Sequence, residues 1–389
     1  MPYYRVVGEV PRKRHTQFRK PDGSLYAEEL MGVEGFSSDS ALLYHEHAPT
    51  AILDVVGVDE PEQKLVANHP LKPRHFKTHK LDVTSADLVT GRQLLLGNDD
   101  VRISYVVADS PSPLYRNAAG DELVYVEAGA ATVETVFGVL NVGAGDYVVL
   151  PTSTTHRWIP SADEPVRALV AEARGHVGPP RRYLSVKGQF LEHAPYCERD
   201  LRGPTQPHYV ADGGEAQVLV RHRAGCTRYT YAHHPFDVVG WDGCLYPYAF
   251  SIHDFEPITG RLHQPPPVHQ TFEGPGFVVC SFVPRLFDYH PQAIPAPYNH
   301  ANVDSDEVLF YTQGEFMSRK GAGIEVGSIS LHPSGHIHGP QPGSVEASIG
   351  KASTDEYAVM IDTFRPLQIG DAATACEDTG YAWSWAGGR

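Results

Sequence analysis

Apolar positions in this chain form short runs that glycine and proline interrupt. Residues 123–126 and 308–311 are apolar runs followed closely by a glycine, and residues 147–150 and 329–331 are followed by a proline within two residues. Short apolar runs bounded by turn-forming residues are typical of buried β-strands. The 36 glycines and 32 prolines leave few stretches long enough for an uninterrupted helix. The pattern therefore predicts a mostly β chain with few short helices.

The same punctuation of strands occurs twice, about half the chain apart. The first copy contains the series Glu122, Gly129, Gly145, Pro151 and His156. The second contains Glu307, Gly314, Gly327, Pro333 and His338. In both copies the proline follows the second glycine by six residues, and the histidine follows that glycine by eleven. Matching spacing at this distance predicts an internal duplication.

Short antiparallel strands with glycine and proline corners predict a jelly roll, in which the glutamate and the later histidine face the barrel interior. The two copies resemble the two motifs of the cupin superfamily, G-x5-H-x-H-x3-4-E-x6-G and G-x5-P-x-G-x2-H. We therefore predict a bicupin with two jelly-roll barrels. Residues 1–240 would form an N-terminal domain with a degenerate, metal-free barrel, and residues 241–389 a C-terminal barrel that holds a metal site.

Only the second copy contains a complete set of candidate metal ligands. His300 and Asn302 fill the two histidine positions of the motif, and Glu307 and His338 complete it. Two imidazoles and one carboxylate on one side of a metal leave about three octahedral positions open, which is the arrangement expected for non-heme Fe(II). Mn(II) accepts the same donors, so the spacing leaves the choice of metal open. The simpler alternative is a pair of barrel histidines beside a strand-end charge.

In the first copy the corresponding positions hold Tyr115, Arg116 and Asn117, while Glu122 and His156 remain. A guanidinium beside the site opposes metal binding electrostatically. We therefore expect a structural, metal-free barrel in which Arg116 pairs with Glu122.

Several further histidines lie outside these motifs. His45 and His47 could chelate from one face of a strand, but a polar loop is the expectation there. A Pro/Lys-rich stretch predicts solvated loop positions for three others, His69, His75 and His79. Four more histidines lie near the second motif, and we expect one or two of them to line the pocket as proton-transfer or substrate-binding residues. The four are His263, His269, His332 and His336.

The composition narrows the classes of function. Acidic residues outnumber Lys plus Arg by 47 to 32, giving a formal charge of −15, which argues against nucleic-acid binding. The chain has no apolar run of membrane-spanning length and no secretory leader pattern, so a cytoplasmic protein without membrane attachment is expected. The five cysteines are scattered and odd in number, so neither a disulfide framework nor a cysteine metal site is expected.

One segment carries a more specific resemblance. Residues 234–248 resemble the P-F-x-V-V-x-W-H-G-x-x-x-P-Y signature of the homogentisate 1,2-dioxygenase family. Pro284-Arg285 and the His300-x-Asn302 pair follow in the family's order, and residues 25–30 look like its N-terminal L-Y-A-E-x-L stretch. The resemblance spans most of the chain and is densest from about Tyr231 to Pro340.

The resemblance implies a role for several residues. It implies that His300, Glu307 and His338 bind Fe(II), that His263 is the catalytic base, and that His332, Phe316 and His338 lie at the substrate. This chain departs from the family in two places. Ser305 or Asp306 is an insertion before the glutamate, and Phe316 stands where the family has a substrate-binding tyrosine, a loss for which Arg319 or Lys320 could compensate. The resemblance also implies a homo-oligomer, with trimers paired into hexamers.

The leading hypothesis is an Fe(II)-dependent ring-cleaving dioxygenase that converts homogentisate and O2 to 4-maleylacetoacetate in tyrosine and phenylalanine breakdown. The absence of the tyrosine hydroxyl at Phe316 keeps another hydroquinone, such as gentisate, as an alternative substrate. A bicupin that binds a small molecule without turnover is the alternative from a different class. The expected partners are a small aromatic substrate and O2.

Overall fold

The computed structural model describes residues 3–60, 63–81, 86–211, 213–319 and 321–386. The prediction of a mostly β chain is confirmed. Within these residues the α-helices are two short ones, α1 (Ser344–Ser348) and α2 (Asp371–Ala375). No helix in the described ranges is both long and apolar enough to cross a membrane. All five cysteines are free.

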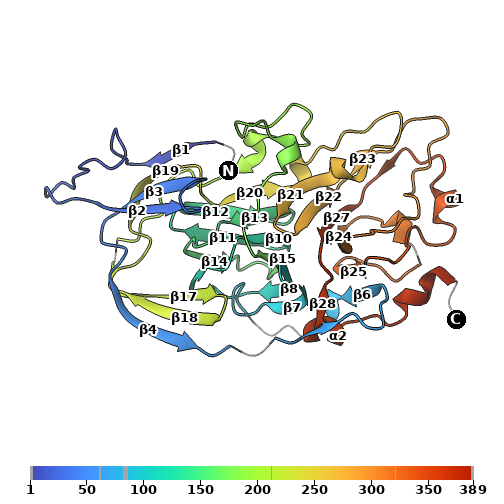
Figure 1. Ribbon diagram of the computed structural model, residues 1–389, viewed down its shortest axis with the longest axis horizontal. Helices are drawn as coiled ribbons and strands as arrows, with labels where there is room; N and C mark the ends of the chain where they lie inside the picture. The colour runs from blue at the N-terminus through green and yellow to red at the C-terminus, as the bar shows by residue number, and fades with distance from the viewer. Residues whose placement is uncertain (1–2, 61–62, 82–85, 212, 320, 387–389) are drawn as a thin grey trace.

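Three large sheets build the molecule (Figure 1). The first has nine strands in the order β16 (Leu201–Arg202), β20 (Tyr248–Ser251), β13 (Asp146–Leu150), β10 (Glu122–Ala128), β15 (Val166–Ala173), β8 (Val101–Ala108), β7 (Gln93–Gly97), β28 (Gln368–Gly370) and β5 (Leu65–Ala67). The second has seven, in the order β12 (Gly138–Gly143), β11 (Ala130–Thr135), β14 (His156–Pro160), β9 (Leu114–Asn117), β17 (Ala216–His222), β18 (Gly225–Tyr231) and β4 (Ile52–Val58).

The third large sheet has six strands and belongs mainly to the C-terminal half. Its order is β21 (Gln270–Gly274), β22 (Phe277–Phe282), β27 (Tyr357–Thr363), β24 (Asp306–Gln313), β25 (Ser328–His332) and β6 (Arg74–Lys77). Two smaller sheets complete the fold. They consist of β1 (Arg5–Gly8), β19 (Val238–Gly243), β3 (Ser40–His45) and β2 (Ala27–Gly32), and of β23 (Arg285–Leu286) with β26 (Ser353–Thr354).

The nine-stranded sheet is buried on both faces, which explains why its strands read as continuous apolar runs. Val124 and Val148 pack with Trp158 of the seven-stranded sheet in one core. On the opposite face Tyr125 packs with Phe310 of the six-stranded sheet in another. Successive residues on a strand point to opposite faces, so one run of apolar residues supplies both cores.

The predicted duplication is confirmed by the order and register of the strands. The central strands run β13-β10-β15-β8 in the first copy and β25-β24-β27-β22 in the second. Glu122 lies opposite Glu172 on β15, and Glu307 lies opposite Asp362 on β27. The C-terminal half differs in its second sheet, which has only the short strands β23 and β26, and loops surround β23 in Figure 1.

The two halves exchange strands. β20 follows residue 240 in the chain but pairs with β13 of the first half. β6 precedes residue 240 but pairs with β25 of the second half. β19 itself runs across residue 240 and pairs with β1 and β3. These pairings fasten the first barrel to the second, and the division of the chain at residue 240 stays a prediction.

A buried ion network closes the interior of the first barrel. Arg92 contacts both carboxylate oxygens of Glu122 at 2.8 Å and one oxygen of Glu172 at 3.2 Å. Burial alone would raise the pKa of Glu122, but the Arg92 charge lowers it to about 2. The expected partner, Arg116, instead donates to the hydroxyls of Thr155 and Tyr231. The predicted pairing of Arg116 with Glu122 is therefore wrong.

Two of the histidine assignments also need correction. His45 lies at the end of β3, only 2% exposed, with its ring nitrogens 2.7 Å from Asp237 and 3.0 Å from Glu29. These carboxylates outweigh burial and raise the pKa of His45 to about 9, so it is a buried imidazolium and not part of a polar loop. His75 is fully buried on β6 with Nε2 2.8 Å from the Ser328 hydroxyl, whereas His69 and His79 are exposed as expected.

Replacing Arg92 by methionine should lower the free energy of unfolding by about 3–5 kcal/mol, because two buried carboxylates lose their cation. Since the folded pKa of Glu122 lies below its usual value of 4.5, the stabilisation is present above that pH and is lost as the pH falls toward 2. Denaturant titration of the wild type and Arg92→Met at pH 7 measures the difference. The matched control is Arg365→Met, whose ion pairs are exposed and should contribute less than about 1 kcal/mol. An equal, small loss in both variants would contradict the interpretation.

Candidate metal centre

Backbone pairing brings the three predicted ligands together. His300 precedes β24 and His338 follows β25, and the two residues exchange backbone hydrogen bonds of 2.8 and 2.9 Å. Glu307 lies on β24 with its side chain on the same inner face as the two imidazoles. One nitrogen of each histidine and one carboxylate oxygen all lie within 4.8 Å of one another. The structure thus assembles His300, Glu307 and His338 into one cluster, at the spacing that the sequence motif predicted.

The second nitrogen of each imidazole is held by a backbone carbonyl. Nδ1 of His300 lies 3.2 Å from the Tyr298 carbonyl, and Nδ1 of His338 lies 3.2 Å from the His336 carbonyl. A carbonyl can only accept, so these contacts place the proton on Nδ1. Nε2 of each ring is then left with a lone pair for a metal. The local chain geometry therefore prepares both rings as ligands.

The donors fit a divalent cation. Nε2 of His338 is buried and has no hydrogen-bond partner, and it lies 3.3 Å from a Glu307 oxygen. Nε2 of His300 lies 3.6 Å from the other Glu307 oxygen. Burial alone would raise the pKa of Glu307, but the surrounding imidazoles keep it well below its usual value. Two imidazoles and an ionised carboxylate are donors that suit Fe(II) and Mn(II).

His332 lies directly behind Glu307. It is fully buried, with Nδ1 2.8 Å from Glu307 Oε1 and Nε2 2.8 Å from the Tyr381 hydroxyl. Burial lowers the pKa of His332 to about 3, so the ring is neutral and fixes the orientation of the glutamate. Both of its nitrogens have partners within the protein. The contact with substrate that the family resemblance implies for His332 stays a prediction.

Two ionisable groups lie near the cluster: Asp362 was missed at the level of sequence, and Arg319 was named there only as a residue that could compensate for Phe316. Asp362 interrupts the apolar run of β27, and burial followed by the charge of Glu307 raises its pKa to about 8. Its Oδ1 atom is buried without a partner. Arg319 is 6% exposed and donates to the Tyr311 hydroxyl and the Gly339 carbonyl. Within the described residues no carboxylate lies at ion-pair distance from it.

The remaining predicted site residues lie farther out. The His263 side chain is 54% exposed, with Nδ1 3.1 Å from Asp288 Oδ2 and its ring edge-on to Tyr298, which in turn faces His300. Phe316 is half-buried against the Tyr311 ring at 4.8 Å. Lys320 lies outside the described residues. The roles of His263 and Phe316 stay predictions.

His269 and His336 differ in burial. His269 is buried against Phe282, and burial lowers its pKa to about 3. His336 is half-buried and stacks on the ring of His338. His336 is therefore the one of this pair that lies beside the cluster.

The first barrel holds altered counterparts of the same cluster. Tyr115 pairs with His156 across β9 and β14, as His300 pairs with His338, and Glu122 matches Glu307. Even the turn is kept, since Ser153 adopts the left-handed φ of +64° that Gly335 adopts at +78°. Here, however, a tyrosine replaces one imidazole and the Arg92 guanidinium binds the carboxylate. The duplicated geometry is thus retained with a protein cation at its centre.

The duplicated cupin barrels and the cluster of two histidines and a glutamate define a bicupin with a candidate metal centre. Comparison with known families agrees with the signature at residues 234–248. The model of the N-terminal part of homogentisate 1,2-dioxygenase matches residues 5–252. The chain belongs to the homogentisate 1,2-dioxygenase family.

Relatives along the full length support this assignment. A "putative dioxygenase" of Saccharolobus solfataricus is 41% identical, covering 99% of both chains. Homogentisate 1,2-dioxygenase of Emericella nidulans is 23% identical over 95% of this chain and 84% of its own. That of Rhodopseudomonas palustris is 25% identical over 98% and 90%. Among solved structures, oxalate decarboxylase of Bacillus subtilis matches 80% of this chain and 81% of its own at 12% identity, with a TM-score of 0.36.

Replacing His338 by alanine should remove most of the bound metal, because two remaining protein ligands hold a divalent cation poorly against water. Metal analysis of protein purified without oxygen and loaded with Fe(II) measures the stoichiometry. His156→Ala is the matched control, since it removes the corresponding histidine of the first barrel and should leave the metal content unchanged. Half the metal lost in His156→Ala would place a second metal in the first barrel. Full retention in His338→Ala would remove that residue from the ligand set.

Proposed function

We propose that this protein is an Fe(II)-dependent dioxygenase that converts homogentisate and O2 to 4-maleylacetoacetate. The single observation that supports this most is the cluster of His300, Glu307 and His338 in a chain of this family. The reaction adds both oxygen atoms of O2 to the substrate, so atoms and electrons balance without a further reductant. No other cofactor is therefore needed.

In the proposed mechanism His300, Glu307 and His338 hold the iron, and His332 keeps the glutamate oriented. When bound, Fe(II) supplies the redox chemistry that allows dioxygen to react with an aromatic ring. His263 takes the proton of a substrate hydroxyl. Its Nδ1–H can donate to Asp288, which leaves the lone pair of Nε2 as the proton acceptor. Asp288 is then the group that orients the base.

The charge of the site favours a substrate with an anionic substituent. Arg319 is a buried cation whose described partners are neutral, the Tyr311 hydroxyl and the Gly339 carbonyl. Buried charges are normally compensated, so a carboxylate entering this region gains a favourable interaction. Homogentisate carries such a group. This is the compensation for Phe316 that the sequence suggested, with Arg319 as the residue that provides it.

Phe316 is the observation that favours a second candidate. Its ring packs against Tyr311 and has no hydroxyl that could donate a hydrogen bond to the carboxymethyl group of homogentisate. This favours a different hydroquinone such as gentisate. A metal-binding protein without turnover is the candidate from another class. The predicted assembly of trimers into hexamers is an independent proposal, measured by light scattering of the full chain.

The deciding experiment is an oxygen-uptake assay of Fe(II)-loaded protein, mixed with substrate under anaerobic conditions before O2 is added. We expect one O2 consumed per homogentisate, with the absorbance of a ring-opened product, and less activity on gentisate and on unsubstituted hydroquinone. Higher activity on gentisate would favour the second candidate. Stoichiometric iron without oxygen uptake on any of the three compounds would favour the protein without turnover.

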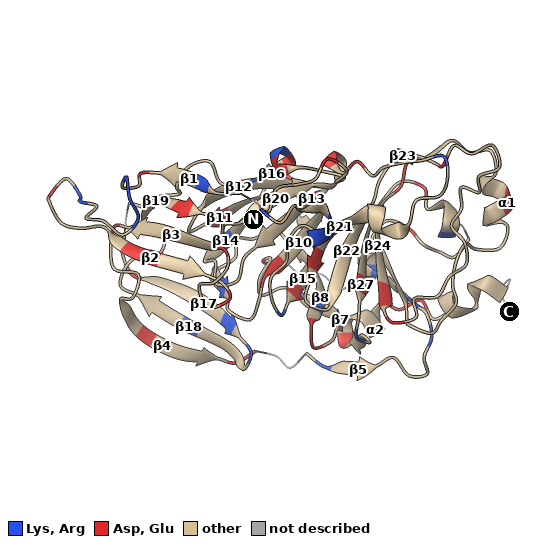
Figure 2. Cartoon of the chain, turned by 45° about the horizontal axis from the view of Figure 1, so that its top comes forward, with Lys and Arg blue, Asp and Glu red and all other residues tan. Residues whose placement is uncertain are grey.

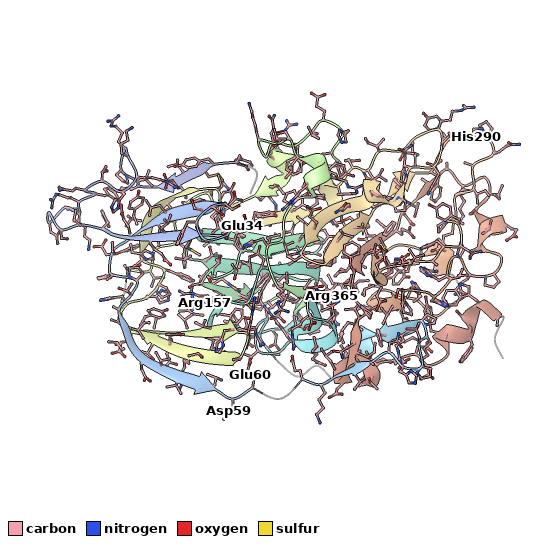
Figure 3. All side chains as sticks on the ribbon, viewed as in Figure 1. Glu34, Asp59, Glu60, Arg157, His290 and Arg365 are labelled. Carbon is pink, nitrogen blue, oxygen red and sulfur yellow. The ribbon has the colours of Figure 1, made fainter. Side chains whose placement is uncertain are left out.

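His263→Gln should lower kcat by about 10²–10⁴-fold, because general-base catalysis contributes on that scale. Iron content and most of the substrate affinity should be retained, since His263 is not among the ligands. Side-by-side values of kcat, KM and iron content for three variants check this. His269→Gln tests the buried competitor, and His290→Gln is the control, a half-buried histidine at the edge of the molecule (Figure 3). A rate loss in His269→Gln with none in His263→Gln would exchange the roles.

A further inference from the structure

A polar cavity lies in the N-terminal half, at the mouth of the first barrel. Its volume is about 650 Å³, within the range of small-molecule sites. It extends from the surface near Asp59 and Glu60, labelled in Figure 3, to the interior of the barrel. At its inner end the lining includes Arg92, Tyr115 and Glu172. The cavity therefore reaches the cluster that matches the metal centre of the second barrel.

Tyr115 provides the first sign of a ligand. It occupies the register position of His300, it is 1% exposed, and its hydroxyl is buried without a hydrogen-bond partner among the described residues. A buried hydroxyl without a partner costs free energy, and native proteins rarely leave one unsatisfied. Because Tyr115 lines the cavity, a bound molecule can supply the missing partner.

The Arg92 guanidinium excludes a metal as that molecule. It binds both oxygens of Glu122 and one of Glu172, and its Nε donates to the Leu88 carbonyl. The carboxylate that would ligate a cation is thus already neutralised. All three nitrogens of Arg92 have protein partners, so the ligand has to be recognised by other groups on the cavity wall.

Arg102 provides the second sign. Arg102 lines the cavity, and its Nη2 donates to the Gln63 amide oxygen, but its Nε is buried and has no partner among the described residues. A guanidinium nitrogen can only donate, and the Tyr115 hydroxyl can also donate. Arg221 adds positive charge, with Glu60 at 2.8 Å and Glu172 at 3.7 Å. Acidic and basic residues are intermixed in this half (Figure 2). The hydrogen-bond donors on the cavity wall, rather than the net charge, therefore determine which class of ligand can bind.

We propose that the first barrel binds a small organic carboxylate in this cavity, with its oxygens accepting hydrogen bonds from the Tyr115 hydroxyl and Arg102 Nε. The site is separate from the candidate metal centre and does not depend on the proposed dioxygenase activity. In this proposal the first barrel has an anion-binding site where the second has its candidate metal centre, with Tyr115 and Arg102 as the donors.

Binding of benzoate to the metal-free full chain tests the proposal, with benzamide as the uncharged molecule of the same shape. Isothermal titration should show one saturable site for benzoate and at least about tenfold weaker binding of benzamide. Tyr115→Phe and Arg102→Gln should each weaken benzoate binding by at least about tenfold. Arg157→Gln and Tyr209→Phe, which alter residues outside the cavity lining, should leave it unchanged.

Thermal unfolding of each variant shows whether weaker binding comes from the loss of one contact or from the loss of the folded structure. If Tyr115→Phe does not fold, Arg102→Gln still tests the proposal. His338→Ala should bind benzoate like the wild type, because it alters only the second barrel. Loss of binding in His338→Ala would place the carboxylate at the metal centre and overturn the proposal. The proposal would also fail if neither benzoate nor acetate bound up to about 10 mM, or if benzoate bound equally well to both cavity variants.

Discussion

A carboxylate buried at the start of the central strand of each barrel has to be neutralised, and the two barrels meet this requirement differently. Glu122 receives a guanidinium from Arg92, at 2.8 Å on both oxygens. Glu307 lies 2.8 Å from the neutral ring of His332 and faces His300 and His338, with which it forms the candidate site for a metal cation. An ionised carboxylate inside a protein is costly unless it is paired, so the surrounding polar groups are arranged around this one charge.

The candidate metal centre could be predicted from sequence because its geometry is local. His300, Glu307 and His338 belong to short strands joined by tight turns, and glycine and proline at fixed spacing set where each strand ends. The register then follows from backbone pairing, which brings His300 opposite His338. The same reasoning predicted the duplicated barrels and the mostly β class. The features that could be predicted are therefore those whose residues lie within about forty positions of one another in the sequence.

The errors came from contacts that are distant in sequence or from strand alternation. Arg116 lies between Tyr115 and Asn117 on β9, and neighbouring residues on a strand point to opposite faces, so it cannot share the interior with them. The actual partner, Arg92, directly precedes β7 and lies thirty residues before Glu122 in the chain. His75 looked solvated because its neighbours are prolines and lysines, yet β6 pairs with β25 of the other half and is buried there.

The register of the duplication also relates the ion network of the first barrel to the candidate metal centre of the second. Glu172 and Asp362 occupy equivalent positions beside the two central glutamates. In the first barrel one guanidinium bridges both carboxylates and cannot leave, because it is part of the chain. In the second barrel, the described residues place no guanidinium between Glu307 and Asp362, and an oxygen of Asp362 has no partner. The two barrels thus differ in the partner of the central glutamate, which is a guanidinium of the chain in the first and the imidazoles of the candidate metal centre in the second.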